Sequence, residues 1–262
     1  MRLEVLITSM HQSDTSLYQK MNLQSDAVIA NQADCFGYQE ETVGGHTVKM
    51  ITTATRGLSR NRNIALGFSS ADYIAFSDDD LIWNDNYPQL IAREFEAHPE
   101  AEAIKFNIHD LSATRKISMR RIERFEKATR RNMSSSGVCG LVVRADVLKR
   151  LNLHFHENFG TGTENYCGED TIFLMRLLDH KVRLYRSPVD VAGIDQSVSS
   201  WFRGHNAQYF TNCGKLLWEI YPVLACLLAV RSAWRFSRRQ DCSMGFGEIL
   251  TCYYKGMRNH AA

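Results

Sequence analysis

Residues 73–83 read YIAFSDDDLIW, a short apolar run followed at once by three aspartates. A run such as Tyr73–Phe76 is typical of a strand buried in a sheet. Similar runs predict strands at Leu3–Thr8, Ala27–Asn31, Val48–Thr52, Ala103–Asn107 and Leu141–Arg144. Helical patterns lie between or beside them at Thr15–Met21, Ser59–Ser69, Tyr87–Ala97 and Ala145–Leu151. This alternation predicts an α/β fold, with a mostly parallel central sheet flanked by helices.

The three aspartates, Asp78, Asp79 and Asp80, stand at the carboxyl end of that strand, where ligands collect in such sheets. Adjacent carboxylates repel one another unless a cation or hydrogen-bond donors are present. Mg²⁺ and Mn²⁺ prefer oxygen ligands, and their sites often combine one or two carboxylates with substrate phosphates. The alternative is an acidic turn that caps a following helix.

A basic segment, Arg56–Asn63 (RGLSRNRN), opens the helix that leads into the same strand. A helix N-terminus with nearby arginines suits phosphate oxygens. The alternative is a helix capped by Ser59 with solvated arginines. Because basic and acidic segments flank one strand, the arrangement favours a site for a metal ion and a diphosphate.

A second acidic motif, Gly168-Glu169-Asp170, precedes the apolar helical run Thr171–Leu178. Acidic residues are common in a first helical turn, because they complement the helix dipole. The functional alternative makes one carboxylate a general base that the helix N-terminus keeps ionised.

The composition indicates a reduced, cytoplasmic protein. The seven cysteines include no C-x-x-C pair, which argues against a disulfide scaffold or a structural zinc site. No signal peptide is recognisable, since a strand-like run begins at Leu3. The net charge of +2 indicates no particular partner.

Two segments depart from the strand–helix alternation. Arg115–Arg131 holds eight basic and two acidic residues, and fits either a solvated helix or a lid that faces phosphate or membrane. Leu216–Val230 is apolar but shorter than the roughly 20 residues needed to span a bilayer. Basic and aromatic residues follow it up to Arg239, so Leu216–Arg239 is predicted to lie in the headgroup layer. The alternative is packing on the protein's own core.

The motifs, in this order, resemble those of family-2 glycosyltransferases of the GT-A fold. The family's Arg-Asn pair looks like Arg62-Asn63, its D-x-D motif like Asp78-x-Asp80, and its E-D motif like Glu169-Asp170. The chain also resembles a bacterial cell-surface polysaccharide subgroup with segments similar to Gly57–Asn63, Gly168–Thr171 and Ser199–Phe202. The resemblance covers residues 1–210 and implies a GT-A domain there, and from their own pattern residues 211–262 are expected to form a C-terminal helical, membrane-associating extension.

The resemblance also implies roles for individual residues. Asp170 would be the general base, supported by Glu169, and Asp78 and Asp80 would bind Mn²⁺ or Mg²⁺. Donor nucleotide contacts would come from Thr8, Ser9, Asn31, Gln32, Asp34, Arg62, Asn63, Asp78 and Asp79.

Two departures from the family pattern qualify these roles. Asn31 stands where the family usually has an acidic residue, which leaves the nucleobase contacts open. Gln196 and Trp201 are present, but not in the Q-x-x-R-W spacing of processive synthases, so a non-processive enzyme is expected.

The expected activity is therefore inverting, metal-dependent transfer from a nucleotide-diphosphate sugar, by family frequency a UDP-sugar, to a glycan or lipid-linked acceptor. An anionic membrane surface is an expected partner and nucleic acid is not. The expected location is cytoplasmic, peripheral on the inner face of the plasma membrane.

Three other classes remain as alternatives. A nucleotidyltransferase would normally carry a Gly-rich basic loop after the first strand, where this chain has Ser9–Asp14. An aspartate-nucleophile phosphatase would need Thr or Val at Ile82. A non-catalytic sugar-binding or membrane scaffold protein would share the binding residues without turnover.

Overall fold

The computed structural model describes residues 1–111, 121–134, 136–194 and 204–261. The strands are β1 (Leu3–Met10), β2 (Asp26–Gln32), β3 (Gly37–Val43), β4 (His46–Thr53), β5 (Tyr73–Asp78), β6 (Leu81–Trp83), β7 (Ala103–Asp110), β8 (Glu126–Lys127), β9 (Leu141–Arg144) and β10 (Leu184–Ile194). The helices are α1 (Leu17–Lys20), α2 (Leu58–Phe68), α3 (Tyr87–Ala97), α4 (Arg130–Met133), α5 (Ala145–Leu151), α6 (Glu169–Asp179), α7 (Ala207–Ile220), α8 (Ala225–Phe236) and α9 (Phe246–Ala261). Each strand and each helix predicted from the sequence is present, with shifts of a few residues at the ends.

The described strands form one sheet in the order β3-β4-β2-β1-β5-β9-β7-β10-β6, with β8 paired to β10. Strands β4, β2, β1 and β5 run parallel, as expected for buried strands joined by helical crossovers. In this register Ser9 lies beside Asn31, and Thr8 lies beside Asp78. The polar residues that end these strands therefore meet at one edge of the sheet.

The sheet is mixed but mostly parallel, as expected, because β10 pairs parallel to β7 and both run in the same direction as β4, β2, β1 and β5. β9 runs antiparallel to both of its neighbours, β5 and β7. The chain leaves β7 at the carboxyl edge and returns to that edge at Gly140, whose N–H bonds to the Phe76 carbonyl. The next strand, β9, therefore enters the sheet from that edge and runs in the opposite direction.

The hairpin strand β3 is absent from the sequence prediction because it carries no apolar pattern. Six of its seven residues are exposed. A Gly44-Gly45 turn with positive φ at both glycines joins it to β4, and this dipeptide is a hairpin signal. β3 is an edge strand whose last residue, Val43, packs against an apolar cluster of the core.

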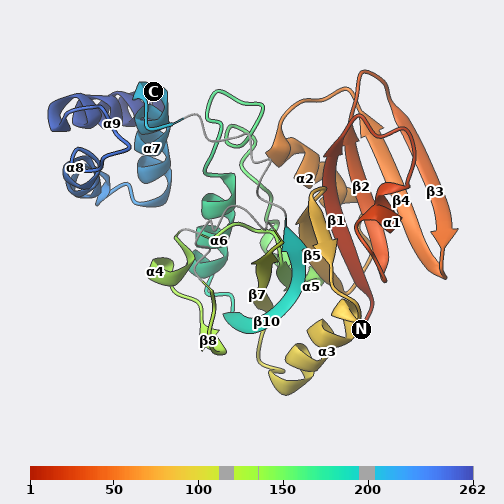
Figure 1. Ribbon diagram of the computed structural model, residues 1–262. Helices are drawn as coiled ribbons and strands as arrows, with labels where there is room; N and C mark the ends of the chain where they lie inside the picture. Colours follow the sequence, from red (N-terminus) through yellow and green to blue (C-terminus); the bar gives the residue numbers. More distant parts are fainter. Residues whose placement is uncertain (112–120, 135, 195–203, 262) are drawn as a thin grey trace.

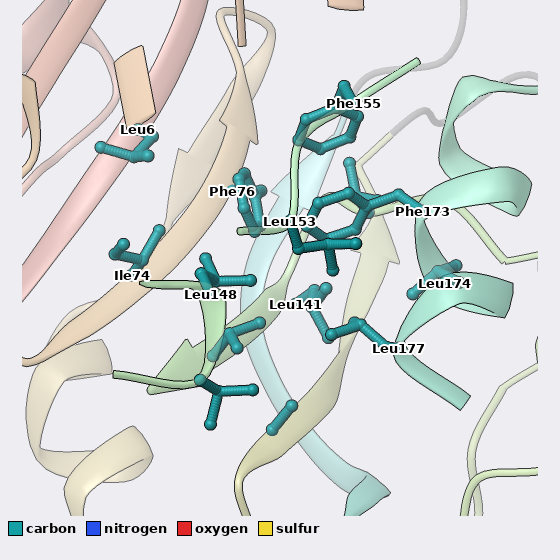
Figure 2. Close-up of a cluster of buried hydrophobic side chains, with 14 of the residues drawn as sticks. Leu6, Ile74, Phe76, Leu141, Leu148, Leu153, Phe155, Phe173, Leu174 and Leu177 are labelled. Carbon is teal, nitrogen blue, oxygen red and sulfur yellow. The ribbon is translucent and has the colours of Figure 1, made fainter. Parts of the chain in front are cut away.

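Two apolar clusters cover the faces of the sheet, and one of them fixes α6 (Figure 2). Phe173 of α6 stacks on Phe155 with ring centroids 4.1 Å apart. Both rings meet Phe76 of β5 edge-on at 5.4 Å. This buried aromatic contact holds the start of α6 near the carboxyl end of β5.

Helices α7, α8 and α9 form a separate layer with a small core of its own, at the end of the molecule opposite β3 (Figure 1). Helices α7 and α9 touch so closely that a Cβ at Gly256 would lie 2.0 Å from the Thr211 carbonyl oxygen. The predicted boundary between residues 210 and 211 lies inside α7, and Phe210 belongs to the helical core. The apolar run Leu216–Val230 is divided between α7 and α8 by a break that contains Pro222. No helix among the described residues is both long and apolar enough to cross a membrane.

The basic segment Arg115–Arg131 is described only from Arg121 onward. This part contains β8 and the start of α4, so one continuous helix does not form there. The Ser199–Phe202 motif, Gln196 and Trp201 lie outside the described residues.

Candidate active site

The carboxyl edge of β1 and β5 brings two pairs of predicted site residues together. The Thr8 hydroxyl donates to Asp78 Oδ1 at 2.9 Å, and the Ser9 hydroxyl donates to Asp79 Oδ2 at 2.6 Å. The parallel register places each hydroxyl beside its aspartate. These donors reduce the repulsion expected among adjacent carboxylates.

Arg62 joins the two acidic motifs. One guanidinium nitrogen lies 3.0 Å from Asp78 Oδ1, and the other bonds to Asp170 Oδ1 and lies 3.8 Å from Glu169. The side chain is only 4% exposed and lies over the Phe155 ring, 5.2 Å from its centroid. Residues 62, 78 and 170, far apart along the chain, therefore share one buried cation.

The charges at this site stabilise one another. Burial alone would lower the pKa of Arg62, but the charges of Asp170 and Asp78 raise that pKa well above its usual value. Burial would likewise raise the pKa of Asp78, but Arg62 and the Thr8 hydroxyl together lower it. Arg62 and the partly exposed Asp78 thus form an ionised pair.

Asp170 lies in the first turn of α6, as the sequence predicted. Its Oδ2 accepts the backbone N–H of Val138 at 3.0 Å, opposite the bond to Arg62. A Cβ at Gly137 would lie 3.1 Å from Oδ2, so only a small residue leaves that oxygen room. The left-handed φ of 111° at Gly168 starts the helix.

Glu169 precedes Asp170 and is buried. Burial raises the pKa of Glu169 to about 7, and the nearby charge of Asp170 adds to the effect while Arg62 opposes it. Glu169 is therefore the carboxyl group of this cluster that holds a proton most easily near neutral pH.

Asp80 is exposed, yet nearby protein atoms and the charges of Asp78 and Asp79 raise its pKa to about 6. Strand β6 follows at Leu81, so the alternative of a helix-capping acidic turn is wrong. Among the described residues, no group of three or more His, Cys, Asp or Glu side chains is arranged to hold a metal ion.

Residues 32–150 match the family model described as glycosyl transferase family 2. This part of the chain is similar to family-2 glycosyltransferases. No curated protein matches it by sequence.

Solved structures agree on the GT-A fold. A crystal structure of S. aureus TarS residues 1–349 with UDP-GlcNAc has a TM-score of 0.66 and 12% identity, covering 100% of this chain and 92% of TarS 1–349. TarS 1–349 without that ligand gives 0.64 and 13%, covering 100% and 91%. A longer TarS chain gives 0.59 and 15%, covering 92% of this chain and 44% of TarS. At these identities the likeness shows the fold.

Three residues predicted to contact the nucleotide lie at the end of β2 or just after it. The Asn31 amide is fully buried and bonds to the backbone of Gln12 and to Thr52. The Gln32 side chain accepts the Gly57 N–H at 3.1 Å. Asp34 is exposed and pairs with Arg56. Asn31 and Gln32 thus fasten loops at the carboxyl edge, whereas Asp34 presents a carboxylate to solvent.

The Arg56–Asn63 segment does not follow the alternative interpretation of a helix capped by Ser59. Ser59 does not cap α2, because its buried hydroxyl donates to the Phe159 carbonyl at 2.6 Å. The Leu58 N–H, in the first turn, bonds to the Thr161 carbonyl. Asn63 bonds to the backbone of Phe155. The segment therefore ties α2 to the loop before α6, and Arg62 is its residue at the acidic cluster.

Sequence reasoning missed Lys105 of β7, although a lysine in a buried strand was a visible signal. Its ammonium is buried and donates to the carbonyls of Cys139 at 2.7 Å and Phe106 at 3.0 Å. Burial lowers the pKa of Lys105 to about 8, against opposing effects from Cys139 and Asp170. Lys105 thereby holds Cys139 in place. The residue before it, Val138, donates its N–H to Asp170.

Proposed function

We propose that this protein is an inverting, metal-dependent and non-processive glycosyltransferase, and moves a sugar from a UDP-sugar to a glycan or lipid-linked acceptor. The observation that carries the proposal is the buried Arg62, which contacts Asp78 of the first acidic motif and Asp170 of the second. The carboxylate that binds the nucleotide-sugar donor and the carboxylate that acts as base must lie on two sides of one sugar ring. Arg62 brings the two acidic motifs that would supply them to one place.

The donor would bind at the carboxyl edge of β1, β2 and β5, where parallel sheets collect ligands. Crystal structures of TarS hold UDP-GlcNAc or UDP on the same fold, which supports a uridine diphosphate donor here. Thr8, Ser9, Asp34, Asp79 and Arg62 have polar groups at or near this edge. We assign Asn31, Gln32 and Asn63 to shaping the edge, on the contacts described above.

Mn²⁺ or Mg²⁺ would be held by Asp80 together with Asp78. The residues fit such an ion, because nearby protein atoms and two like charges raise the pKa of Asp80, and a cation would offset those charges. One or two carboxylates plus substrate phosphates are the usual protein site for these ions. When bound, the ion would stabilise the negative charge that grows on the departing diphosphate.

Asp170 would accept the proton of the acceptor hydroxyl while the oxygen of that hydroxyl forms its bond to the anomeric carbon of the sugar. The bond from that carbon to the diphosphate oxygen breaks in the same step, and UDP leaves with the electron pair. Attack opposite the leaving group inverts the configuration. Arg62 and the Val138 N–H each bond to one oxygen of Asp170 and so orient its carboxylate.

We place this reaction at the cytoplasmic face of the membrane, where lipid-linked acceptors are reached.

The proposal predicts that Asp80→Ala abolishes the Mn²⁺-dependent part of UDP binding, measured by calorimetry with and without Mn²⁺. The matched control is Asp146→Ala, which removes an exposed carboxylate from α5, away from the carboxyl edge.

The readouts also separate the alternatives. UDP release from a UDP-sugar supports transfer, whereas pyrophosphate release from UTP with a sugar phosphate would identify a nucleotidyltransferase. Binding without any turnover would identify a scaffold protein. Unchanged metal-dependent affinity in Asp80→Ala would remove the metal assignment.

A further inference from the structure

Helix α8 presents an apolar stripe to solvent. Val223 is 93% exposed, Leu227 67% and Trp234 51%, and Val230 is also exposed. Val223 lies in the turn before α8, and Leu227, Val230 and Trp234, spaced three and four residues apart, lie on one face of the helix. The opposite face, formed by Ala225, Ala229 and Ala233, is fully buried against the other helices. Such a continuous exposed apolar surface marks a contact with something outside the chain.

Arginines border this stripe. Arg231, Arg235 and Arg238 are exposed, and none of them pairs with a carboxylate among the described residues. The Arg238 guanidinium lies over the Trp234 ring, 4.1 Å from its centroid. The sequence from Tyr221 to Gln240 contains no acidic residue. The surface is therefore apolar in its centre and positively charged along its border.

We propose that this α8 surface, defined by Val223, Leu227, Val230, Trp234 and the flanking Arg231, Arg235 and Arg238, binds an anionic lipid surface. Anionic headgroups complement the arginines while acyl chains take up the stripe, as in interfacial helices. Tryptophan is favoured at the boundary between headgroups and acyl chains.

Two other arrangements are disfavoured: charge disfavours self-association through this surface, and length disfavours a helix that spans the bilayer. A second copy of the same surface would bring two sets of arginines together without carboxylates to pair them, which disfavours association. The 12 residues of α8 measure roughly 18 Å, less than the roughly 30 Å of a bilayer's hydrocarbon core. The helix therefore lies along the membrane surface. This inference does not depend on the glycosyl transfer proposed above.

The test is co-sedimentation of the full chain with phosphatidylcholine vesicles, with and without about 30% phosphatidylglycerol. We expect at least about tenfold stronger partitioning onto the anionic vesicles, weakening as salt rises, because surface charge is screened. Leu227→Asp should reduce that partitioning at least tenfold. Its matched control is Phe36→Asp, which adds the same charge at a residue 78% exposed beside the edge strand β3.

A second pair of variants tests the arginines alone. Arg231→Glu with Arg235→Glu should abolish the preference for anionic vesicles, whereas Arg93→Glu with Arg124→Glu changes the net charge equally and should keep it. Thermal unfolding checks that each variant folds. The proposal is overturned if Leu227→Asp partitions like the wild type, or if the wild type ignores anionic vesicles. A dimer in light scattering that Leu227→Asp dissociates would also overturn it.

Discussion

Two buried cations, Arg62 of α2 and Lys105 of β7, both interact electrostatically with Asp170, yet their surroundings act in opposite directions. Arg62 contacts the carboxylates of Asp78 and Asp170, and its pKa is raised. Lys105 is satisfied by two backbone carbonyls, and burial lowers its pKa to about 8.

The difference shows what holds a charge inside this protein. Carbonyl dipoles satisfy the hydrogen bonds of an ammonium but do not repay the loss of water around a full charge. Carboxylates at close range compensate for that loss of water, provided that each carboxylate is also hydrogen-bonded. Arg62 therefore keeps its positive charge, whereas the lowered pKa of Lys105 brings the loss of its proton close to neutral pH.

The largest expected effect follows from removing Arg62. Arg62→Met leaves Asp78, Glu169 and Asp170 near one another without their cation, and we expect the free energy of unfolding to fall by about 3–5 kcal/mol. Urea unfolding at pH 7 measures it. The loss should shrink toward pH 4, because protonated carboxyl groups no longer need the arginine.

Arg60→Met is the matched control, since Arg60 lies on the same helix and pairs with Glu157 at the surface. An exposed pair contributes roughly 0–1 kcal/mol. Equal losses for Arg60→Met and Arg62→Met would contradict the distinction drawn between buried and exposed pairs.

A smaller, pH-dependent effect is expected at Lys105. The folded pKa of about 8 lies below the unfolded value of 10.5, so the unfolded chain binds more protons between these pH values. The wild type should therefore gain stability relative to Lys105→Met as pH rises from 8, by about 2 kcal/mol at pH 9.5. Urea unfolding of both proteins at pH 7 and pH 9.5 gives the difference.

The nearby groups that interact electrostatically with Lys105 are present in both proteins, so their own contributions largely cancel. They are Cys139, Asp170 and Arg186. Lys127→Met, at an exposed position in β8, is the control and should show no such dependence. A difference that stays constant with pH would mean that Lys105 has an ordinary pKa.

The same contrast separates what the sequence predicts from what it does not. The parallel strands β4, β2, β1 and β5 were predictable because each reads as an apolar run. β3 carries no such pattern and was missed. β8 has two residues, and β10 pairs with β7 through register shifts that break the periodicity. The direction of β9 depends on where the chain returns to the sheet, which local residues do not encode.

At the site, the motifs placed Arg62, Asp78 and Asp170 correctly near one another, because each follows a strand or begins a helix. The sequence could not show that one guanidinium joins both acidic motifs, since that contact spans 108 positions along the chain. Nor could it show that Asn31 and Asn63 bond to backbone groups. Lys105 was visible as a charge in a buried strand, but its distant partner, the Cys139 carbonyl, comes from the segment before β9.

The central claim is that Asp170, held by Arg62, is the base of the reaction. Its most direct test is the rate of UDP release from a UDP-sugar by Asp170→Asn, measured beside calorimetric UDP affinity. We predict a rate about 10²–10⁴-fold lower, with UDP affinity nearly unchanged, because general-base catalysis contributes that much and the nucleotide contacts remain. A correctly folded Asp170→Asn enzyme that releases UDP at close to the wild-type rate would contradict the account and leave Glu169 as the next candidate.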